Sequence, residues 1–215
     1  MPVPVLWSLV VPLKPLAVAK SRLAPAAGTV RPGLALAFAQ DTVAAVLACA
    51  RVRSVTVVTD DPMAAAELAA LGARVVPDTP AAGLNAALAH GGHLIRSAAP
   101  DAAVAALNAD LPALRPLELS AVLDEAARAP GRAFLADAAA IGTTLLTAPP
   151  GHDLAPAFGG LSRARHRASG AREITLRGVD SVRQDVDTPA DLRVALALGV
   201  GPRTADVAAG LLIPD

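Results

Sequence analysis

Two kinds of apolar pattern alternate along the chain. Short, nearly continuous apolar runs such as 3–11 are typical of strands buried on both faces of a sheet, and the β-branched run at 52–59 is also typical of a strand. Between such runs, apolar residues recur with the period of a helix. We predict strands at 3–11, 52–59, 73–77, 103–107, 132–136, 143–148 and 173–177, and helices at 32–50, 63–71, 83–97, 116–129 and 189–198.

This order of elements predicts an α/β fold. Strands that alternate with helices of about 10–15 residues are joined by right-handed crossovers, which produce a mostly parallel sheet with helices on both faces. We expect one three-layer domain over residues 1–215, because no repeat or flexible linker divides the chain. In such sheets a ligand binds beyond the carboxyl ends of the strands, so the residues after each strand are the candidates for chemistry.

Composition and charge exclude several classes of function. The 19 basic and 19 acidic residues balance, so no overall field attracts the protein to nucleic acid or to a membrane surface. Aromatic residues make up 2% of the chain, too few for a platform on which bases stack. The single cysteine, Cys49, excludes an intrachain disulfide, and we find no signal-peptide pattern or uninterrupted apolar span. We expect a soluble cytoplasmic protein that binds neither nucleic acid nor membrane.

The loop after the first strand carries both lysines of the chain, Lys14 and Lys20, whereas the 17 other cationic side chains are arginines. With Ser21 and Arg22, these lysines place three cations and a hydroxyl at the carboxyl end of a buried strand. A triphosphate needs such a set of groups, although a solvated basic loop has the same composition. Neither G-x-G-x-x-G nor a Walker A motif occurs, which argues against a dinucleotide oxidoreductase and a P-loop nucleotidase.

Carboxylates stand at two other positions of interest. Asp110 comes shortly after strand 103–107, where it suits a Mg²⁺ ion bound to phosphates, or else a turn in which it binds its own backbone. Asp185 and Asp187 precede a helix that begins near Thr188, and alternation puts the two on the same side of an extended segment. Either of them qualifies as a second metal ligand.

Two further segments are suited to a small anion. The sequence GTTLL at 142–146 is strand-like, and FGGLS at 158–162 precedes a basic stretch. Ser162 and the glycines before it could begin a helix whose free N–H groups bind a phosphate or a carboxylate. Positive charge is added by Arg163, Arg165, His166 and Arg167. A basic amphipathic helix packed on the sheet explains the same residues equally well.

Seven motifs follow one another in a specific order. They are PLKPLAVAKSRL at 12–23, TVVTDDP at 56–62, DTPAAGLNAAL at 78–88, LNADLPAL at 107–114, GTTLL at 142–146, FGGLSRARH at 158–166 and DVDTPADL at 185–192. As an ordered set over about residues 5–198, they resemble the 2-phospho-L-lactate and phosphoenolpyruvate guanylyltransferases of coenzyme F420 biosynthesis. The resemblance implies a MobA-like nucleotidyltransferase fold with one Rossmann-like, three-layer domain. It also implies an enzyme that transfers a nucleoside monophosphate from a nucleoside triphosphate to an acidic acceptor.

The resemblance also implies roles for individual residues on the nucleotide side. Asp110 and Asp187 match the aspartates that hold Mg²⁺ in the family, with Asp185 as the substitute. The triphosphate loop comprises Lys14, Lys20, Ser21 and Arg22. Its three cations, Lys14, Lys20 and Arg22, are implied to be catalytic. The first loop departs from the glycine-rich, arginine-containing segment of the wider superfamily, which narrows the family to members with this lysine pattern.

On the remaining part of the site, the resemblance implies that Gly83, Leu84 and Asn85 meet the base and ribose. The phosphate and carboxylate of the acceptor would be held by Thr144, Gly159 and Ser162. Frequent alanine and arginine indicate GC-rich coding, as in actinobacteria, whose family members use phosphoenolpyruvate. We therefore expect GTP and phosphoenolpyruvate as substrates, with the next enzyme of the pathway as a candidate partner for the labile product.

Other assignments stay open at this point. Within the same class they are a 2-phospho-L-lactate guanylyltransferase, a molybdenum-cofactor guanylyltransferase and a sugar-phosphate nucleotidyltransferase. Outside it, a non-catalytic nucleotide-binding module is the alternative. The paired segments GTTLL and GGLS favour a small anion over a pterin or a sugar, and two aspartates at separate strand ends favour catalysis over simple binding.

Overall fold

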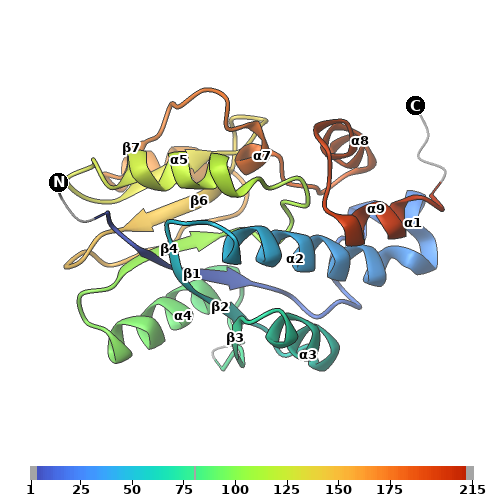
Figure 1. Cartoon of the computed structure of the whole chain (residues 1–215), viewed down its shortest axis with the longest axis horizontal. Coiled ribbons are helices and arrows are strands. Elements are labelled where there is room, and N and C mark those ends of the chain that lie inside the picture. The colour runs from blue at the N-terminus through green and yellow to red at the C-terminus, as the bar shows by residue number, and fades with distance from the viewer. Residues whose placement is uncertain (1–3, 80, 212–215) are drawn as a thin grey trace.

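The computed structural model describes residues 4–79 and 81–211, and its centre is a seven-stranded sheet in the order β3-β2-β1-β4-β6-β5-β7 (Figure 1). Only β6 runs antiparallel to its neighbours, so the expected mostly parallel sheet is confirmed. The strands are β1 (Trp7–Pro12), β2 (Val52–Val58), β3 (Arg74–Val76), β4 (Ala103–Leu107), β5 (Ala133–Ala136), β6 (Thr143–Ala148) and β7 (Arg172–Glu173).

Helices cover both faces of the sheet, which gives the predicted three layers (Figure 1). One face packs against α2 (Arg31–Leu47), α3 (Pro62–Ala70), α5 (Pro116–Ala126) and α7 (Asp180–Arg183). The other face packs against α4 (Leu84–Ala98) and carries α6 (Ser162–Ala168). Beyond the end of the sheet lie η1 (Ser21–Leu23), α1 (Ala24–Ala27), η2 (Gly28–Val30), α8 (Pro189–Leu198) and α9 (Pro202–Ala208).

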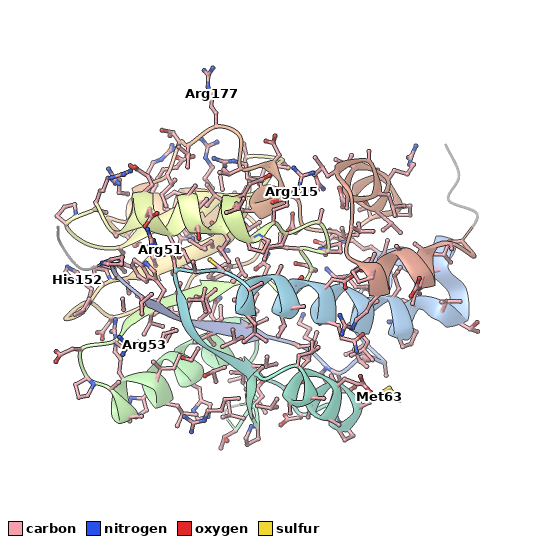
Figure 2. The ribbon with its side chains drawn as sticks, in the orientation of Figure 1. Arg51, Arg53, Met63, Arg115, His152 and Arg177 are labelled. Atoms are coloured by element: carbon pink, nitrogen blue, oxygen red, sulfur yellow. The ribbon has the colours of Figure 1, made fainter. Side chains whose placement is uncertain are left out.

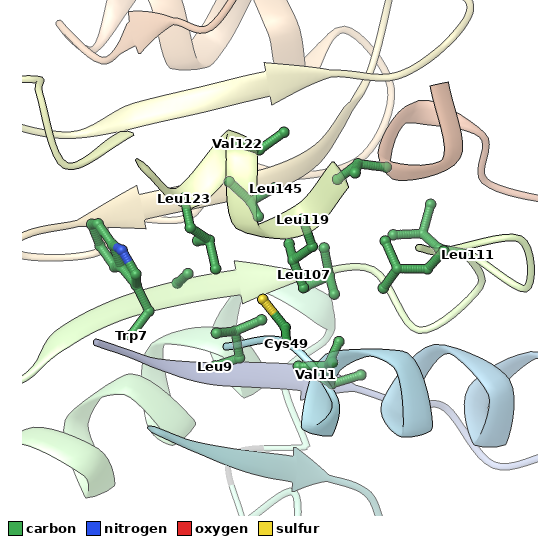
Figure 3. Close-up of a cluster of buried hydrophobic side chains, with 14 of the residues drawn as sticks. Trp7, Leu9, Val11, Cys49, Leu107, Leu111, Leu119, Val122, Leu123 and Leu145 are labelled. Atoms are coloured by element: carbon green, nitrogen blue, oxygen red, sulfur yellow. The ribbon is translucent and has the colours of Figure 1, made fainter. Parts of the chain in front are cut away.

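The main hydrophobic core lies between the sheet and the layer that contains α2 and α5 (Figure 3). Because aromatic residues are scarce, leucine, valine and alanine fill it, with Trp7 at one end. Cys49 is buried in the same cluster and donates to or accepts from Ser120 Oγ at 3.3 Å. A buried thiol of this kind packs as a small apolar side chain. The sequence has no second cysteine with which Cys49 could form an intrachain disulfide.

Proline begins four of the helices, α3, α5, α8 and α9, at their first position. Proline suits this position because its ring presets the helical φ angle and its missing N–H would have no helical partner. For this reason the predicted helix starts agree closely with the structure. The helix α9 and the short α7 were not predicted, since short segments give no clear period.

The strand predicted at 173–177 is present, but it is shorter and begins one residue earlier, as β7 (Arg172–Glu173). β7 ends at Glu173, although the N–H of Ile174 still donates to Phe134 O at 2.8 Å. The Arg183 guanidinium then takes the carbonyl oxygens of Ile174 and Leu176, at 3.3 and 3.2 Å. A side chain from α7 therefore satisfies backbone groups that a longer strand would have paired.

By length and composition, Gly28–Leu47 is the one helical segment within the described ranges that could cross a bilayer, with a mean hydropathy of 1.2. Half of this segment is buried inside the protein, where α2 packs between the sheet and α9. Burial of this kind is that of a core helix in a folded domain. In contrast to this buried helix, charged side chains elsewhere in the protein, such as Arg53 and Arg177, are exposed on the surface (Figure 2).

The order of the strands fixes where a ligand can bind. The chain leaves β1 toward β2 and β3 on one side and returns through β4 on the other side of β1. Between β1 and β4 the direction of winding therefore reverses. In open α/β sheets the crevice at such a point, beyond the carboxyl ends of the strands, is the usual ligand site.

Candidate active site

The loop after β1 is held by side chains from two other elements. Asp61 accepts a hydrogen bond from the loop backbone at 2.8 Å. The Arg31 guanidinium donates to the carbonyl oxygens of Ala19 and, at 2.7 Å, of Ala17. Lys20 follows directly and has a φ angle of 54°, in the left-handed region that a lysine rarely adopts. Strain of this kind persists only where the surroundings impose it, and it is common at functional sites.

Asp110 and Asp187 are far apart in sequence, but their backbones are joined in space. The N–H of Val186 donates to the carbonyl oxygen of Asp110 at 3.0 Å. The turn after β4 is fixed by the N–H of Leu111, which donates to the buried Thr42 Oγ1 at 3.0 Å. As a result, both carboxylates reach the same point beside the carboxyl ends of β1 and β4.

The Lys20 ammonium lies between these two carboxylates. It pairs with Asp110 Oδ2 and lies 2.8 Å from Asp187 Oδ1. Burial alone would lower the pKa of Lys20, but the charges of Asp110 and Asp187 outweigh burial and raise this pKa above its ordinary value. Burial likewise opposes ionisation of Asp187, and the Lys20 charge overcomes it, so that the pKa of Asp187 is lowered. The structure thus contains a cation that bridges the two predicted metal ligands.

Asp185 differs from Asp187 in its ionisation. Burial, followed by the negative charges of Asp110 and Asp187, raises the pKa of Asp185 to about 8. Burial and the two neighbouring negative charges therefore disfavour the ionised form of Asp185 in this arrangement. Between the two aspartates that the sequence left open, the geometry and the charge both favour Asp187 as the cation ligand.

A cavity of about 770 Å³ opens at this place. Residues from the loop after β1, from the end of β4 and from the segment before α8 line one part of it, and residues from 137–143 and 158–162 line the other part. The predicted site residues on its wall are Lys14, Lys20, Ser21, Arg22, Asp110, Gly159, Ser162, Asp185 and Asp187. The structure therefore brings the predicted triphosphate loop, the metal aspartates and most of the predicted acceptor residues into one cavity.

Asp137 shapes the acceptor wall of the cavity. Its carboxylate accepts from the backbone N–H groups of Ile141 (2.9 Å) and Gly142 (2.8 Å). A Cβ atom on Gly142 would lie 2.3 Å from Asp137 Oδ2, so only glycine allows this close approach. Ser162 Oγ is on the same wall, buried and without a hydrogen-bond partner among the described residues. A buried hydroxyl without a partner costs free energy unless a ligand supplies the missing bond.

Thr144 occupies a special place in β6. Leu135 pairs with Leu145 and Ala136 with Thr143, so the register shifts by one residue at Thr144. Its hydroxyl is fully buried and has no partner within the described ranges. The cavity wall includes Thr143 rather than Thr144. A bulge of this kind redirects the backbone, and the side chain of Thr144 stays inside the protein.

The guanidinium groups of the basic stretch in α6 are already engaged within the protein. Arg163 and Arg167 both pair with Glu173 of β7, and Arg165 donates to the carbonyl oxygens of Phe158 and Gly159. These guanidinium groups therefore contribute less positive charge to an acceptor than the sequence indicates. The alternative interpretation, a basic helix packed on the sheet, describes α6 better.

Gly83 and Asn85 lie at the start of α4, and the cavity wall includes Leu84 between them but neither of the two. Gly83 has a φ angle of 93°, which suits a residue without a side chain. The Asn85 amide is paired with the backbone of Phe158: its Oδ1 accepts at 2.8 Å and its Nδ2 donates at 3.2 Å. The structure thus places Asn85 against the segment that carries Gly159.

Asp137 and Phe158 are functional candidates that sequence reasoning missed, and His166 is a buried neutral side chain rather than the source of positive charge that the sequence indicated. Asp137 follows β5 directly, much as Asp110 follows β4, so the same strand-end rule could have found it. Phe158 and His166 are buried and pack against each other, with ring centroids 5.2 Å apart. Their contacts join α4, β6 and α6, and no local pattern in the sequence reveals such contacts.

The donor set of the cavity suits a magnesium ion that arrives with phosphates. No cluster of three or more metal-ligating side chains occurs in the part of the chain that the structure describes. Mg²⁺ commonly uses one or two carboxylates and takes its remaining ligands from phosphates and water. Asp110 Oδ1 is buried and unpartnered there, while Asp187 is about half exposed, so both can accept a cation.

Solved structures share this architecture. A nucleotidyl transferase from Methanothermobacter has a TM-score of 0.62 at 20% identity, over 90% of this chain and 97% of its own. A Desulfovibrio desulfuricans protein of the nucleotide-diphospho-sugar transferase type has a TM-score of 0.63 at 16% identity, over 87% and 85%. At these identities the likeness concerns the fold alone. The fold and the relatives described next define this protein as a nucleotidyltransferase.

The family described as guanylyl transferase CofC like matches residues 7–209. The phosphoenolpyruvate guanylyltransferase of Streptomyces avermitilis is 73% identical over 97% of this chain and 96% of its own. That of Thermomonospora curvata is 64% identical over 94% and 89%. The chain belongs to the guanylyl transferase CofC-like family, and the resemblance seen in the sequence is confirmed.

Proposed function

We propose that this enzyme transfers GMP from GTP to phosphoenolpyruvate, with release of pyrophosphate, in coenzyme F420 biosynthesis. The observation that carries the proposal is the shared cavity, in which unpaired cations and two carboxylates face a wall with glycine and an unpartnered serine hydroxyl. The relatives reported above carry the name phosphoenolpyruvate guanylyltransferase and match nearly the whole chain. The product would be enolpyruvoyl-2-diphospho-5'-guanosine.

On the nucleotide side, Lys14, Lys20 and Arg22 bind the triphosphate and Ser21 donates a hydrogen bond to it. Lys14 and Arg22 line the cavity and have no ionic or hydrogen-bonded partner within residues 4–79 and 81–211. Cations without partners are available for the phosphates of GTP. We also propose that Gly83 contacts the nucleotide at the start of α4, whereas the amide of Asn85 is occupied by Phe158.

Asp110 and Asp187 are the proposed ligands of Mg²⁺, which when bound would neutralise phosphate charge. Lys20 now pairs with both carboxylates, and its ammonium would be available to the phosphates of GTP if Mg²⁺ took its place between them. No side chain need act as a nucleophile, because a phosphate oxygen of the acceptor attacks the α-phosphorus directly. The residues of the chain contribute by holding the two substrates in line and by compensating the charge on the leaving pyrophosphate.

On the acceptor side, Gly159 and Ser162 bind the phosphate and carboxylate of phosphoenolpyruvate. The φ angle of Gly159 is 89°, and no atom lies within 4 Å of the place where its Cβ would be, so a ligand can approach the backbone closely. Thr144 contributes through the backbone at the bulge, next to the cavity-lining Thr143. A cytoplasmic location, with neither nucleic acid nor membrane as a partner and the next pathway enzyme as recipient of the product, belongs to the same proposal.

The test is turnover of the purified enzyme with Mg²⁺ and GTP, measured as pyrophosphate release and as product mass. Phosphoenolpyruvate, 2-phospho-L-lactate, molybdopterin and glucose 1-phosphate are compared as acceptors, and ATP and CTP replace GTP in parallel. We expect the largest kcat/KM with GTP and phosphoenolpyruvate. A larger value for another acceptor or nucleotide would reassign the substrate, and no pyrophosphate with any pair would refute the proposed function.

A further inference from the structure

The backbone from Ala157 to Gly159 runs along the acceptor wall and is held by side chains from two separate helices. Asn85, at the start of α4, makes two hydrogen bonds to one residue: Phe158 N–H donates to Oδ1 at 2.8 Å, and Nδ2 donates to Phe158 O at 3.2 Å. This exchange of both groups is the pattern of a hydrogen-bonded residue pair in an antiparallel sheet. It therefore fixes the orientation of the Phe158 peptide groups on both sides.

The second helix contributes His166, which is fully buried. The N–H of Ala157 donates to His166 Nε2 at 3.0 Å, so Nε2 carries no proton and the neutral ring carries its proton on Nδ1. Nδ1–H in turn donates to Thr143 Oγ1 at 2.9 Å. The ring also packs between Phe134 and Phe158, with centroid distances of 5.7 and 5.2 Å. One neutral histidine thus connects β5, β6 and the segment before Gly159.

These contacts have a consequence for the residues that follow. Gly159 and Gly160 both have positive φ angles, and their carbonyl oxygens accept from Arg165 and, at 2.9 Å, from the N–H of Ser162. Their conformation therefore depends on α6 on one side and on where Phe158 is held on the other. Gly159 and Ser162 both line the cavity. If the segment were released, the two glycines would gain conformational freedom, and an acceptor would have to order them on binding.

We propose that Asn85 and His166 are positioning residues that hold residues 157–159 in the conformation that binds the acceptor. This inference rests on the proposed function for the identity of the acceptor. It also revises the role expected for Asn85. If Asn85 contacted the nucleotide, its loss would raise the KM for GTP, whereas a residue that positions the acceptor wall affects the KM for phosphoenolpyruvate. The two hydrogen bonds of Asn85 thus link the start of α4 to the acceptor wall.

The experiment compares Asn85→Ala and His166→Leu, which remove the hydrogen bonds, with His166→Gln, whose Oε1 can still accept from Ala157 N–H. His93→Gln is the matched control, because His93 lies exposed on α4. We expect about a tenfold increase in the KM for phosphoenolpyruvate for Asn85→Ala and His166→Leu, and a KM for GTP within about twofold of wild type. His166→Gln should recover part of the loss, and His93→Gln should show none.

Hydrogen–deuterium exchange of the wild type and the variants provides a readout that does not depend on turnover. We expect the amides of Ala157 and Phe158 to exchange at least about tenfold faster in Asn85→Ala than in wild type. If the amides exchange at the same rate in Asn85→Ala as in wild type, Asn85 does not hold this segment in place. Faster exchange with an unchanged KM for the acceptor, or an increased KM for GTP alone, would overturn the positioning role. If the wild-type enzyme releases no pyrophosphate, the proposed function is refuted. Amide exchange would still show whether Asn85 holds residues 157–159.

Discussion

The two sides of the cavity differ in how their polar groups are used. The nucleotide side, residues 13–22 with Asp110 and Asp187, holds cations that have no partner in the described ranges or that pair with the proposed metal-binding carboxylates. On the acceptor side, residues 137–144 and 157–166, most polar side chains already bind one another or the backbone. A triphosphate brings large charges that need free counter-charges, whereas a small acceptor needs a wall whose shape is set in advance.

Asp110→Asn tests the nucleotide side where we expect the largest effect. Loss of this charge removes one proposed metal ligand and one partner of Lys20, so kcat/KM should fall at least about 100-fold, or about 2.7 kcal/mol. Steady-state kinetics at saturating Mg²⁺ measures this fall, and the melting temperature verifies the fold. Asp101→Asn, at an exposed position away from the cavity, is the control. Retention of more than about half of the activity would remove Asp110 from the site.

Lys20→Arg tests whether the nucleotide side needs a compact cation. A planar guanidinium is wider than an ammonium and cannot occupy the same place between Asp110 and Asp187, so kcat/KM for GTP should fall about thirtyfold. Lys14→Arg, at an exposed and unpaired lysine, should cost only a few-fold. Equal kinetics for Lys20→Arg and wild type would show that the lysine pattern is not required.

Ser162→Ala and Thr144→Val test which of the two hydroxyl groups on the acceptor side contacts the ligand. Ser162 Oγ lies on the cavity wall, so its loss should raise the KM for phosphoenolpyruvate about tenfold, the effect of one hydrogen bond to a charged group. Thr144 Oγ1 is buried away from that wall, so valine should change this KM by less than about twofold. The KM for GTP serves as the internal reference. The reverse order of effects would place the Thr144 hydroxyl, and not Ser162, on the ligand.

The smallest effect concerns the pH dependence of stability on the acceptor side. Burial, followed by the charges of Arg132 and Arg165, lowers the pKa of His166 from 6.5 to about 4. Between these values the unfolded chain binds more protons than the folded protein, so stability falls as the pH falls through this window. From pH 7.5 to 6.0 the expected loss is about 0.8 kcal/mol, or about 2–3 °C in melting temperature.

The melting temperature of His166→Gln, which lacks this titration, should fall less over the same interval. The difference between the two slopes isolates His166 from the other titrating groups, since these are common to both proteins. Equal slopes would mean that His166 is not held in its neutral form.

Much of the fold and part of the site followed from local sequence. Buried strands, helix periods and proline at helix starts predicted most elements, and the strand-end rule selected Lys20 and Asp110 from their positions in the sequence alone. The structure brings these two residues together because the carboxyl ends of β1 and β4 are neighbours in the sheet. The assignment of one domain to residues 1–215 stays a prediction.

Other features depended on partners distant in sequence. The length of β7 depends on Arg183, which takes backbone carbonyl groups after the strand. The place of Thr144 depends on a shift in register against β5. Asn85 binds the backbone of Phe158, which is 73 positions away in the sequence. None of these partners leaves a periodic or compositional signal near the residue it controls.

The α/β class, the family and the strand ends at which charged residues gather could all be predicted from the amino-acid sequence. These follow from periodicity and from motif order, which are properties of neighbouring residues. The folded arrangement was needed to see that Lys20 bridges Asp110 and Asp187, and that Asn85 binds the backbone of Phe158. The reason is physical: the charge state and the hydrogen-bond partners of a side chain depend on the groups that folding brings within a few ångströms of it.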